Sequence, residues 1–311
     1  MNMEKFWYWN KSLGILTNRP MTEDSNPIKI GILPHELRYE IKLGSVPLHL
    51  LDWPGQIGPV SGTIADLSTH DHVVVYPSSK RLLYSFGPLN CKVDLLMAEP
   101  LAIHGKYYRN IWLLRHKFNY ILCRYHQYAA KYANVIQLAV VESWVDGESV
   151  PWPMVKHHNC SLIASEKTDL IGHKLRHEVV EWVKQTNADV DVLGRGYKPF
   201  ELKQDGLLAY HYSVVIENVP EPDCFTEKLL DCMLCGTLPI YYGPKNIGEY
   251  FNLLGIIACD SIAEFQASIV ATVNPPNEAQ LAAMAENRQI ALGYSNLQQR
   301  IVDTIRNQPC K

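Results

Sequence analysis

The sequence predicts an α/β protein with two Rossmann-like domains that face a cleft. Short apolar runs rich in β-branched residues recur along the chain, each followed by turn or helix signals. This is typical of strands buried on both faces of a parallel sheet. A stretch punctuated by Gly147, Pro151 and Pro153 interrupts the pattern, which then begins again. At roughly 150 residues per domain, a chain of 311 residues has room for about two such units.

We expect an N-terminal arm over residues 1–27, a first domain over 28–155 and a second domain over 156–311. The stretch 142–160 is the predicted linker between the two domains. Strand candidates in the first domain are 28–33, 72–77, 93–97, 120–122 and 135–140. Strand candidates in the second domain are 161–165, 190–193, 212–216 and 238–242, with helices expected at 174–185 and from Thr226 onward.

Charge and composition exclude several classes of protein. Lys and Arg total 29 while Asp and Glu total 32, so the net charge of −3 gives no general attraction to nucleic acid or to an anionic membrane. Hydrophobic residues make up 47% of the chain, which is a globular value. The sequence shows no signal peptide and no apolar run near the ~20 residues of a membrane span. We therefore expect a cytoplasmic protein whose eight cysteines are reduced thiols.

The densest group of polar residues follows the strand candidate 212–216. Glu217 and Asn218 come directly after this strand, and a proline-rich loop leads from them to Thr226, Glu227 and Lys228. Thr226 is suited to cap a helix, and Glu227 complements the positive end of the helix dipole. Free backbone N–H groups and a lysine at a helix N-terminus form a natural site for a diphosphate. The same pattern also fits an ordinary capped helix with a solvated lysine.

A second cation follows the strand candidate 190–193. Arg195 lies between Gly194 and Gly196, in a turn that is too short for a dinucleotide-binding fingerprint. Because ligands bind at the carboxyl ends of parallel strands, we expect Arg195 and Lys228 to lie on the same edge of one sheet.

These residues together resemble a known family. The segment 207–244 is similar to the donor-binding motif of the family-10 glycosyltransferases, the α-1,3-fucosyltransferases. The upstream segment 190–196 resembles the strand of this family that ends in Gly-Arg. Good similarity covers about 160–258, whereas the first half of the chain matches loosely. The matching elements are Tyr210-His211-Tyr212, Glu217-Asn218, Thr226-Glu227-Lys228-Leu229, Gly236-Thr237-Leu238-Pro239-Ile240 and Gly243-Pro244.

The resemblance implies the GT-B architecture, with an acceptor-binding first domain and a donor-binding second domain. It implies an inverting transfer of L-fucose from GDP-fucose to a hydroxyl group of a glycan, as in protein glycosylation and other carbohydrate chemistry, with no cofactor or metal required. Arg195 and Lys228 would hold the diphosphate, and Glu227 would accept hydrogen bonds from ribose or fucose hydroxyls. The implied donor-binding residues are Arg195, Glu217, Asn218, Thr226, Glu227 and Lys228. The missing leader and anchor fit a bacterial or viral enzyme better than one of the Golgi.

The transfer also needs a general base for the proton of the acceptor hydroxyl. The resemblance suggests an acid just after a strand of the first domain, and Glu99, followed by Pro100, matches that position. Glu142 is the alternative, because the neighbouring Trp144 could raise its pKa. The alternative to a catalytic role is that Glu99 is an ordinary surface glutamate before a turn proline.

The sequence departs from the family at one informative place. The tyrosine that precedes Val-Thr-Glu-Lys in the family is Cys224 here, and the valine is Phe225. One donor contact is thereby lost, and Phe225 could supply an aromatic surface from the next position.

Other motifs favour structural roles. Cys232 and Cys235 form a CxxC without a partner pair, so we interpret them as core residues. Asp189 and Asp191 match an Asp-x-Asp motif, but the second acid falls within a strand, which disfavours a metal site. Alternative functions are a transferase for another GDP- or UDP-sugar and a non-catalytic nucleotide-sugar-binding protein. A Rossmann oxidoreductase is disfavoured because no G-x-G-x-x-G follows a strand.

Overall fold

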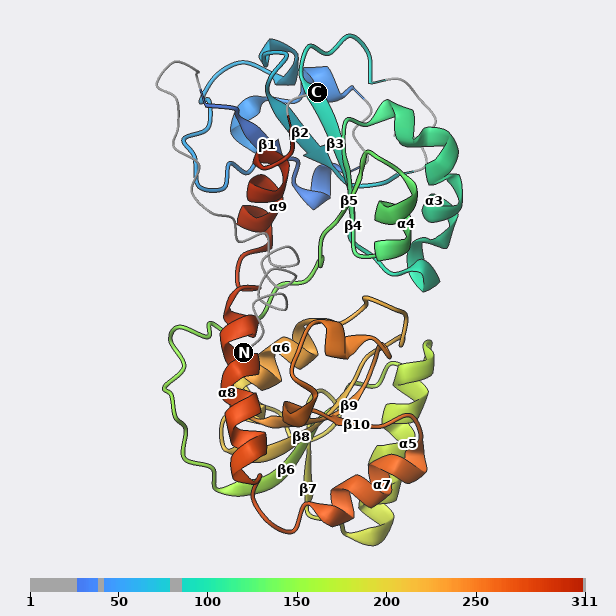
Figure 1. Ribbon diagram of the computed structural model, residues 1–311, viewed down its shortest axis with the longest axis vertical. Coiled ribbons are helices and arrows are strands. Elements are labelled where there is room, and N and C mark those ends of the chain that lie inside the picture. The colour runs from blue at the N-terminus through green and yellow to red at the C-terminus, as the bar shows by residue number, and fades with distance from the viewer. Residues whose placement is uncertain (1–26, 39–41, 79–85, 310–311) are drawn as a thin grey trace. The chain divides into compact units, whose positions relative to one another are not determined.

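The computed structural model describes residues 27–38, 42–78 and 86–309, so the predicted N-terminal arm lies almost wholly outside the described residues. The chain divides into two compact units (Figure 1). The first unit comprises Met1–Val140 and Leu297–Lys311, and the second comprises Val141–Asn296. Each unit contains a five-stranded parallel sheet with helices packed on it, which is the predicted fold class. In the described parts of the chain, no helix is both long enough and apolar enough to cross a membrane.

The strands of the first sheet follow each other in chain order, β1-β2-β3-β4-β5, and every neighbouring pair is parallel. These strands are β1 (Ile30–Ile32), β2 (His72–Val75), β3 (Lys92–Met97), β4 (Ile121–Cys123) and β5 (Val135–Gln137). The helices of this unit are α3 (Leu101–Leu114), α4 (His126–Lys131) and α9 (Leu297–Arg306). Short 3₁₀ turns are η1 (His35–Leu37), η2 (Leu43–Ser45), η3 (Leu48–Leu50), η4 (Ile64–Asp66) and η5 (Arg115–Lys117).

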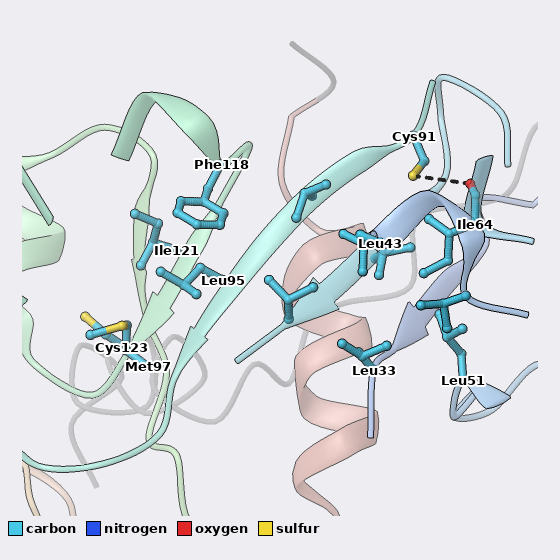
Figure 2. Packing of buried hydrophobic residues seen from close by; sticks show 14 of the residues in the cluster. Leu33, Leu43, Leu51, Ile64, Cys91, Leu95, Met97, Phe118, Ile121 and Cys123 are labelled. Atoms are coloured by element: carbon cyan, nitrogen blue, oxygen red, sulfur yellow. Dashed lines mark hydrogen bonds between the residues drawn. The ribbon is translucent and has the colours of Figure 1, made fainter. Parts of the chain in front are cut away.

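Side chains of the first sheet alternate between two apolar clusters, as the period of two in a strand requires. Leu95 and Met97 of β3 point into one cluster, where Figure 2 shows them near Phe118 and Ile121. Leu96, between them, points into the other cluster. α9 covers that second face, with Ile301, Val302 and Ile305 buried against the strands.

The second sheet has the order β10-β9-β8-β6-β7, again with parallel neighbours only. Its strands are β6 (His158–Ile163), β7 (Val190–Leu193), β8 (Tyr210–Ile216), β9 (Leu238–Tyr242) and β10 (Ile257–Ala258). The helices are α5 (Ile171–Thr186), α6 (Glu227–Leu234), α7 (Ile262–Ala271) and α8 (Glu278–Leu292). The 3₁₀ turns are η6 (Lys203–Gly206), η7 (Ile247–Glu249) and η8 (Leu253–Gly255).

Helices cover both faces of the second sheet (Figure 1). On one face, Val179, Val180 and Val183 of α5 form the predicted helical stripe and pack with residues of α7 against β6, β8 and β9. α6 and α8 contact each other, and α6 packs on β8 and β9 from the opposite face. The carboxyl ends of β6 and β8 are thereby left between the starts of α5 and α6.

The units divide at different places from the boundary expected at residues 155 and 156. The stretch predicted as a linker is bound to the second unit, because Asp231 of α6 accepts hydrogen bonds from the backbone N–H groups of Trp144 and Val145. Arg288 of α8 donates further bonds to the backbone of the same stretch. The C-terminal helix α9, which was expected in the second domain, belongs to the first because its apolar face packs on that sheet.

Candidate functional site: the carboxyl edge of the second sheet

The order of the second sheet creates a topological switch point between β6 and β8. The chain moves from β6 outward to β7 and then returns to the other side of β6 to form β8. The connections after β6 and β8 therefore run to opposite sides of the sheet, and the ligands of open α/β sheets bind at such a point, outside the carboxyl ends of the strands. Glu217 and Asn218, which follow β8, lie at this point.

Glu217 is fully buried and connects the end of β8 to the start of α6. Its Oε1 accepts hydrogen bonds from the N–H of Thr226 at 2.8 Å and from the hydroxyl of Tyr241 at 3.2 Å. Its Oε2 accepts a bond from the hydroxyl of Thr226 at 2.6 Å and lies 3.9 Å from Nζ of Lys228. The carboxylate thus sets the position of the helix start, which is a more structural role than the donor binding that the resemblance implies.

Thr226 is the N-cap of α6, as predicted, and its hydroxyl accepts from the N–H of Lys228. The Lys228 ammonium donates to Thr226 Oγ1 and to Glu227 Oε1, each at 3.1 Å. Burial raises the pKa of Glu227, but the positive charges of Lys228 and Lys203 outweigh this effect and lower the pKa overall. Glu227 is therefore an ionised hydrogen-bond acceptor beside a partly exposed ammonium at the first turn of α6.

The start of α5 lies directly against the same strand end. The Gly172 N–H donates to the carbonyl of Asn218 at 3.0 Å, and a Cβ on Gly172 would lie only 1.8 Å from the carbonyl oxygen of Glu217. Glycine is thus required for this approach. Arg176, one turn further along α5, is buried and donates to the carbonyl of Ile216 at 2.6 Å and to Asn218 Oδ1 at 3.4 Å. Asn218 is held against α5, on the predicted edge of the sheet.

Arg195 lies in the turn after β7 with an exposed side chain, which forms no hydrogen bond or ion pair within the described ranges. Gly194 brings this turn onto the end of β6, because a Cβ there would lie 2.1 Å from the carbonyl oxygen of Ala164, and its φ of +118° is unfavourable for other residues. The structure therefore places Arg195 on the same edge of the sheet as Lys228. This agrees with the expectation from strand order.

The sequence analysis missed a further group of residues at this site. Lys203 of η6 lies with its Nζ 5.2 Å from the ring centroid of Trp144. Asp231, one turn beyond Lys228 on α6, is fully buried, and its Oδ1 accepts from the N–H of Trp144 at 2.8 Å and of Val145 at 3.1 Å. Burial raises the pKa of Asp231 to about 6. These residues are distant in sequence and belong to no motif, so only the fold brings them together.

The replacement of the family tyrosine leaves no aromatic group at the predicted place. Cys224 and Phe225 are both buried. The ring of Phe225 lies 5.0–5.5 Å from the rings of Tyr250, Phe251 and Tyr294, in an aromatic cluster of the core. The expectation that Phe225 offers an aromatic surface to the donor was therefore wrong.

The residues of the competing motifs are held by other contacts. Cys232 and Cys235 are buried thiols, as expected of core residues, and burial raises the pKa of Cys235 to about 12. Asp191 lies within β7 and accepts a hydrogen bond from the hydroxyl of Tyr210 at 2.8 Å. Among the residues that the structure describes, no three His, Cys, Asp or Glu side chains are grouped to hold a metal ion.

Glu99 lies in the first unit, in the turn between β3 and α3, with an exposed side chain. Its carbonyl oxygen accepts a hydrogen bond from the hydroxyl of Tyr108 at 3.3 Å, which fixes the backbone of the turn. The negative charge of Glu99 also acts on His104 in the first turn of α3. Glu142, the alternative base, is exposed at the start of the second unit.

No protein-family model matches the chain. A curated fucosyltransferase-like protein of Arabidopsis thaliana is 32% identical over 82 residues, which is 25% of this chain. The match spans only 16% of the length of that relative. Its name agrees with the resemblance noted in the sequence.

Solved structures share the fold at low sequence identity. A crystal structure of α1,3-fucosyltransferase has a TM-score of 0.55 at 14% identity, covering 97% of this chain and 95% of that one. A structure titled as this enzyme with GDP-fucose has a TM-score of 0.52 at 15% identity, covering 98% of each chain. Staphylococcus aureus TarM, in a complex that contains UDP, has a TM-score of 0.54 at 13% identity, with 78% and 56% covered. The fold is that of GT-B glycosyltransferases.

Proposed function

We propose that the protein is an inverting glycosyltransferase that transfers L-fucose from GDP-fucose to a hydroxyl group of a glycan. The observation that carries this proposal is the arrangement of Glu217, Thr226, Glu227 and Lys228 at the switch point of the second sheet. The sequence of this segment resembles the fucosyltransferase donor motif, and proteins that share the fold are glycosyltransferases, including α1,3-fucosyltransferases.

In this proposal the second unit binds the nucleotide sugar. Arg195 and Lys228 bind the diphosphate, whose charge grows as the bond between the anomeric carbon and the phosphate oxygen breaks. Glu227, which is ionised, accepts hydrogen bonds from sugar hydroxyls. Glu217 and Asn218 support these residues by fixing the starts of α6 and α5.

The acceptor hydroxyl oxygen forms the new bond to the anomeric carbon from the face opposite the departing GDP, so the configuration inverts. The proton of that hydroxyl must be accepted by a base, for which we propose Glu99 of the first unit. Its exposed carboxylate on a turn held by Tyr108 is suited to meet an incoming ligand. The assignment of fucose as the transferred sugar rests on the sequence resemblance. The assignment of a nucleotide-sugar donor in general does not depend on it.

A thermal-shift ranking of nucleotide sugars tests the donor. GDP-fucose should raise the melting temperature more than GDP-mannose, UDP-glucose or UDP-GlcNAc at equal concentration, because bound ligand stabilises the folded state by mass action. A larger shift with a UDP-sugar would favour a transferase that uses a UDP-sugar. TarM, which shares the fold, was solved in a complex that contains UDP. Binding of GDP-fucose without transfer to any glycan of an acceptor array would favour a non-catalytic binding protein.

A further inference from the structure

Lys203 lies at the carboxyl edge of the second sheet, although it belongs to the connection between β7 and β8. Its turn, η6, packs on the ends of two strands: a Cβ on Gly206 would lie 2.9 Å from the side chain of Ile163 and 3.3 Å from that of Leu193. These are the last residues of β6 and β7. Lys203 is therefore next to the switch point.

The surroundings of Lys203 are charged, yet the ammonium has no direct anionic partner. Burial lowers the pKa of Lys203, the charges of Asp231 and Glu227 oppose this effect, and those of Lys228 and Arg176 add to it. Within the described part of the chain, no carboxylate oxygen lies within 4.0 Å of its Nζ. Asp231 also has an unused oxygen, since its Oδ2 is buried without a hydrogen-bond partner.

The other buried or partly buried cations of the site are more fully engaged. Lys228 binds Thr226 and Glu227, and Arg176 binds the carbonyl of Ile216 and Asn218. Lys203 instead lies over the ring of Trp144, a residue that is 72% exposed. Asp231 accepts a hydrogen bond from the backbone N–H of Trp144, and the face of the indole ring attracts the cation. An ammonium placed in this way keeps its hydrogen-bonding capacity for an anion.

We propose that Lys203 is a third cation that binds the diphosphate of the donor, together with Arg195 and Lys228, and that Trp144 positions it. This inference rests on the proposed function, because it names a further ligand of the same nucleotide. The proposal gives a role to η6, for which the sequence motifs suggested none.

Titration calorimetry with GDP and with inorganic pyrophosphate tests the role. Lys203→Met keeps most of the length of the side chain but removes its charge, so both ligands should bind about 10- to 100-fold more weakly and with a smaller dependence on salt. Lys203→Arg should retain most of the affinity. The matched control is Lys131→Met, which removes an exposed lysine that also lies over an aromatic ring, Tyr132, but belongs to α4 of the first unit.

The outcomes separate the two proposals. Wild-type affinity of Lys203→Met for both ligands would overturn the role of Lys203 while leaving the proposed function intact. Weaker binding that Lys203→Arg does not rescue, accompanied by a lowered melting temperature, would show a structural role and also overturn it. If the wild-type protein binds pyrophosphate through Lys203 but not GDP, the anion site stands and the proposed donor is wrong. Binding of neither ligand would refute both.

Discussion

The carboxylate of Glu217 binds both the backbone N–H and the hydroxyl of Thr226, at 2.8 and 2.6 Å. Glu217, the residue that follows β8, therefore determines where α6 begins, and with it the placement of Glu227 and Lys228. Since the carboxylate is buried, these bonds are sensitive to the loss of either partner. These two bonds link the start of α6 to the end of β8.

Thr226→Val tests this coupling. The substitution keeps the volume of the side chain but removes the N-cap and leaves Oε2 of Glu217 without its hydroxyl donor. We expect the free energy of unfolding to fall by about 1–3 kcal/mol, and GDP to bind more weakly because Lys228 loses its support. Urea titration and calorimetry measure the two effects. Thr226→Ser, which keeps the hydroxyl, should be close to wild type in both; an equal loss in the serine variant would contradict the mechanism.

Arg195→Ala should weaken GDP binding about 10-fold or more, because a charge-assisted bond to phosphate is worth about 1.5–3 kcal/mol. The exposed side chain has no structural partner within the described residues, so the melting temperature should not change. Lys198→Met is the control, since it removes an exposed positive charge from the same turn. If both variants lose affinity equally, the turn acts through its general charge and Arg195 has no specific contact.

Local patterns predicted the five strands of the first sheet and four of the second to within a few residues but missed β10, and the N-cap at Thr226 was correct. These features depend on short-range signals: apolar runs, turn residues and capping. Residues 297–306 were assigned to the second domain because they follow it in the sequence, and only the packing of α9 on Ile30 and Leu96 places them in the first unit.

Only part of the candidate site could be predicted, because sequence motifs reveal residues that are close together in the chain. Glu217, Thr226 and Lys228 stand close together in sequence, so a motif can reveal them. Lys203, Asp231 and Trp144 come from separate segments that meet only in the folded unit. The attachment of the predicted linker to the second unit could not be seen in the sequence, because the partner of the Trp144 and Val145 N–H groups lies on α6, nearly ninety residues away.

Asp231→Asn should reveal the cost of burying this carboxylate. Burial raises the pKa of Asp231 from its ordinary value of 3.8 to about 6, so the folded state holds the proton more tightly than the unfolded state. The contribution of this group to stability is fully present below about pH 4 and is lost as the pH rises through about 6. The asparagine keeps an oxygen for the N–H groups of Trp144 and Val145 and carries no charge.

At pH 8 we therefore expect the asparagine variant to be more stable than wild type, by about 1–3 kcal/mol, with the difference narrowing toward pH 4.5. Urea unfolding of both proteins at pH 8 and at about pH 4.5 measures this difference in the free energy of unfolding. A variant that is less stable at pH 8 would mean that the attraction between Asp231 and Lys203 exceeds the cost of desolvation.

Transfer should not depend absolutely on a divalent ion. In the proposed site, Arg195 and Lys228 supply the positive charge that stabilises the departing diphosphate. Fucose transfer measured in excess EDTA should stay within a few-fold of the rate without chelator. Complete loss in EDTA, with recovery on adding Mn²⁺, would show that a metal is required.

Glu99→Gln should separate donor binding from chemistry. The carboxylate is exposed on the turn after β3, in the unit that does not contain the proposed donor site, so the substitution should leave GDP-fucose affinity unchanged. A general base contributes typically ~10²–10⁴-fold, and we expect the transfer rate at saturating acceptor to fall by that factor. Because the amide cannot accept the proton, raising the acceptor concentration should not restore the rate. Calorimetry with the donor and a radiolabel transfer assay give the two quantities on the same preparation.

Glu142→Gln is the matched control and should transfer at nearly the wild-type rate. If Glu142→Gln loses transfer while Glu99→Gln keeps nearly the wild-type rate, the base is Glu142. A Glu99→Gln protein that fails to bind GDP-fucose would instead assign Glu99 to the donor site or to the fold of the turn.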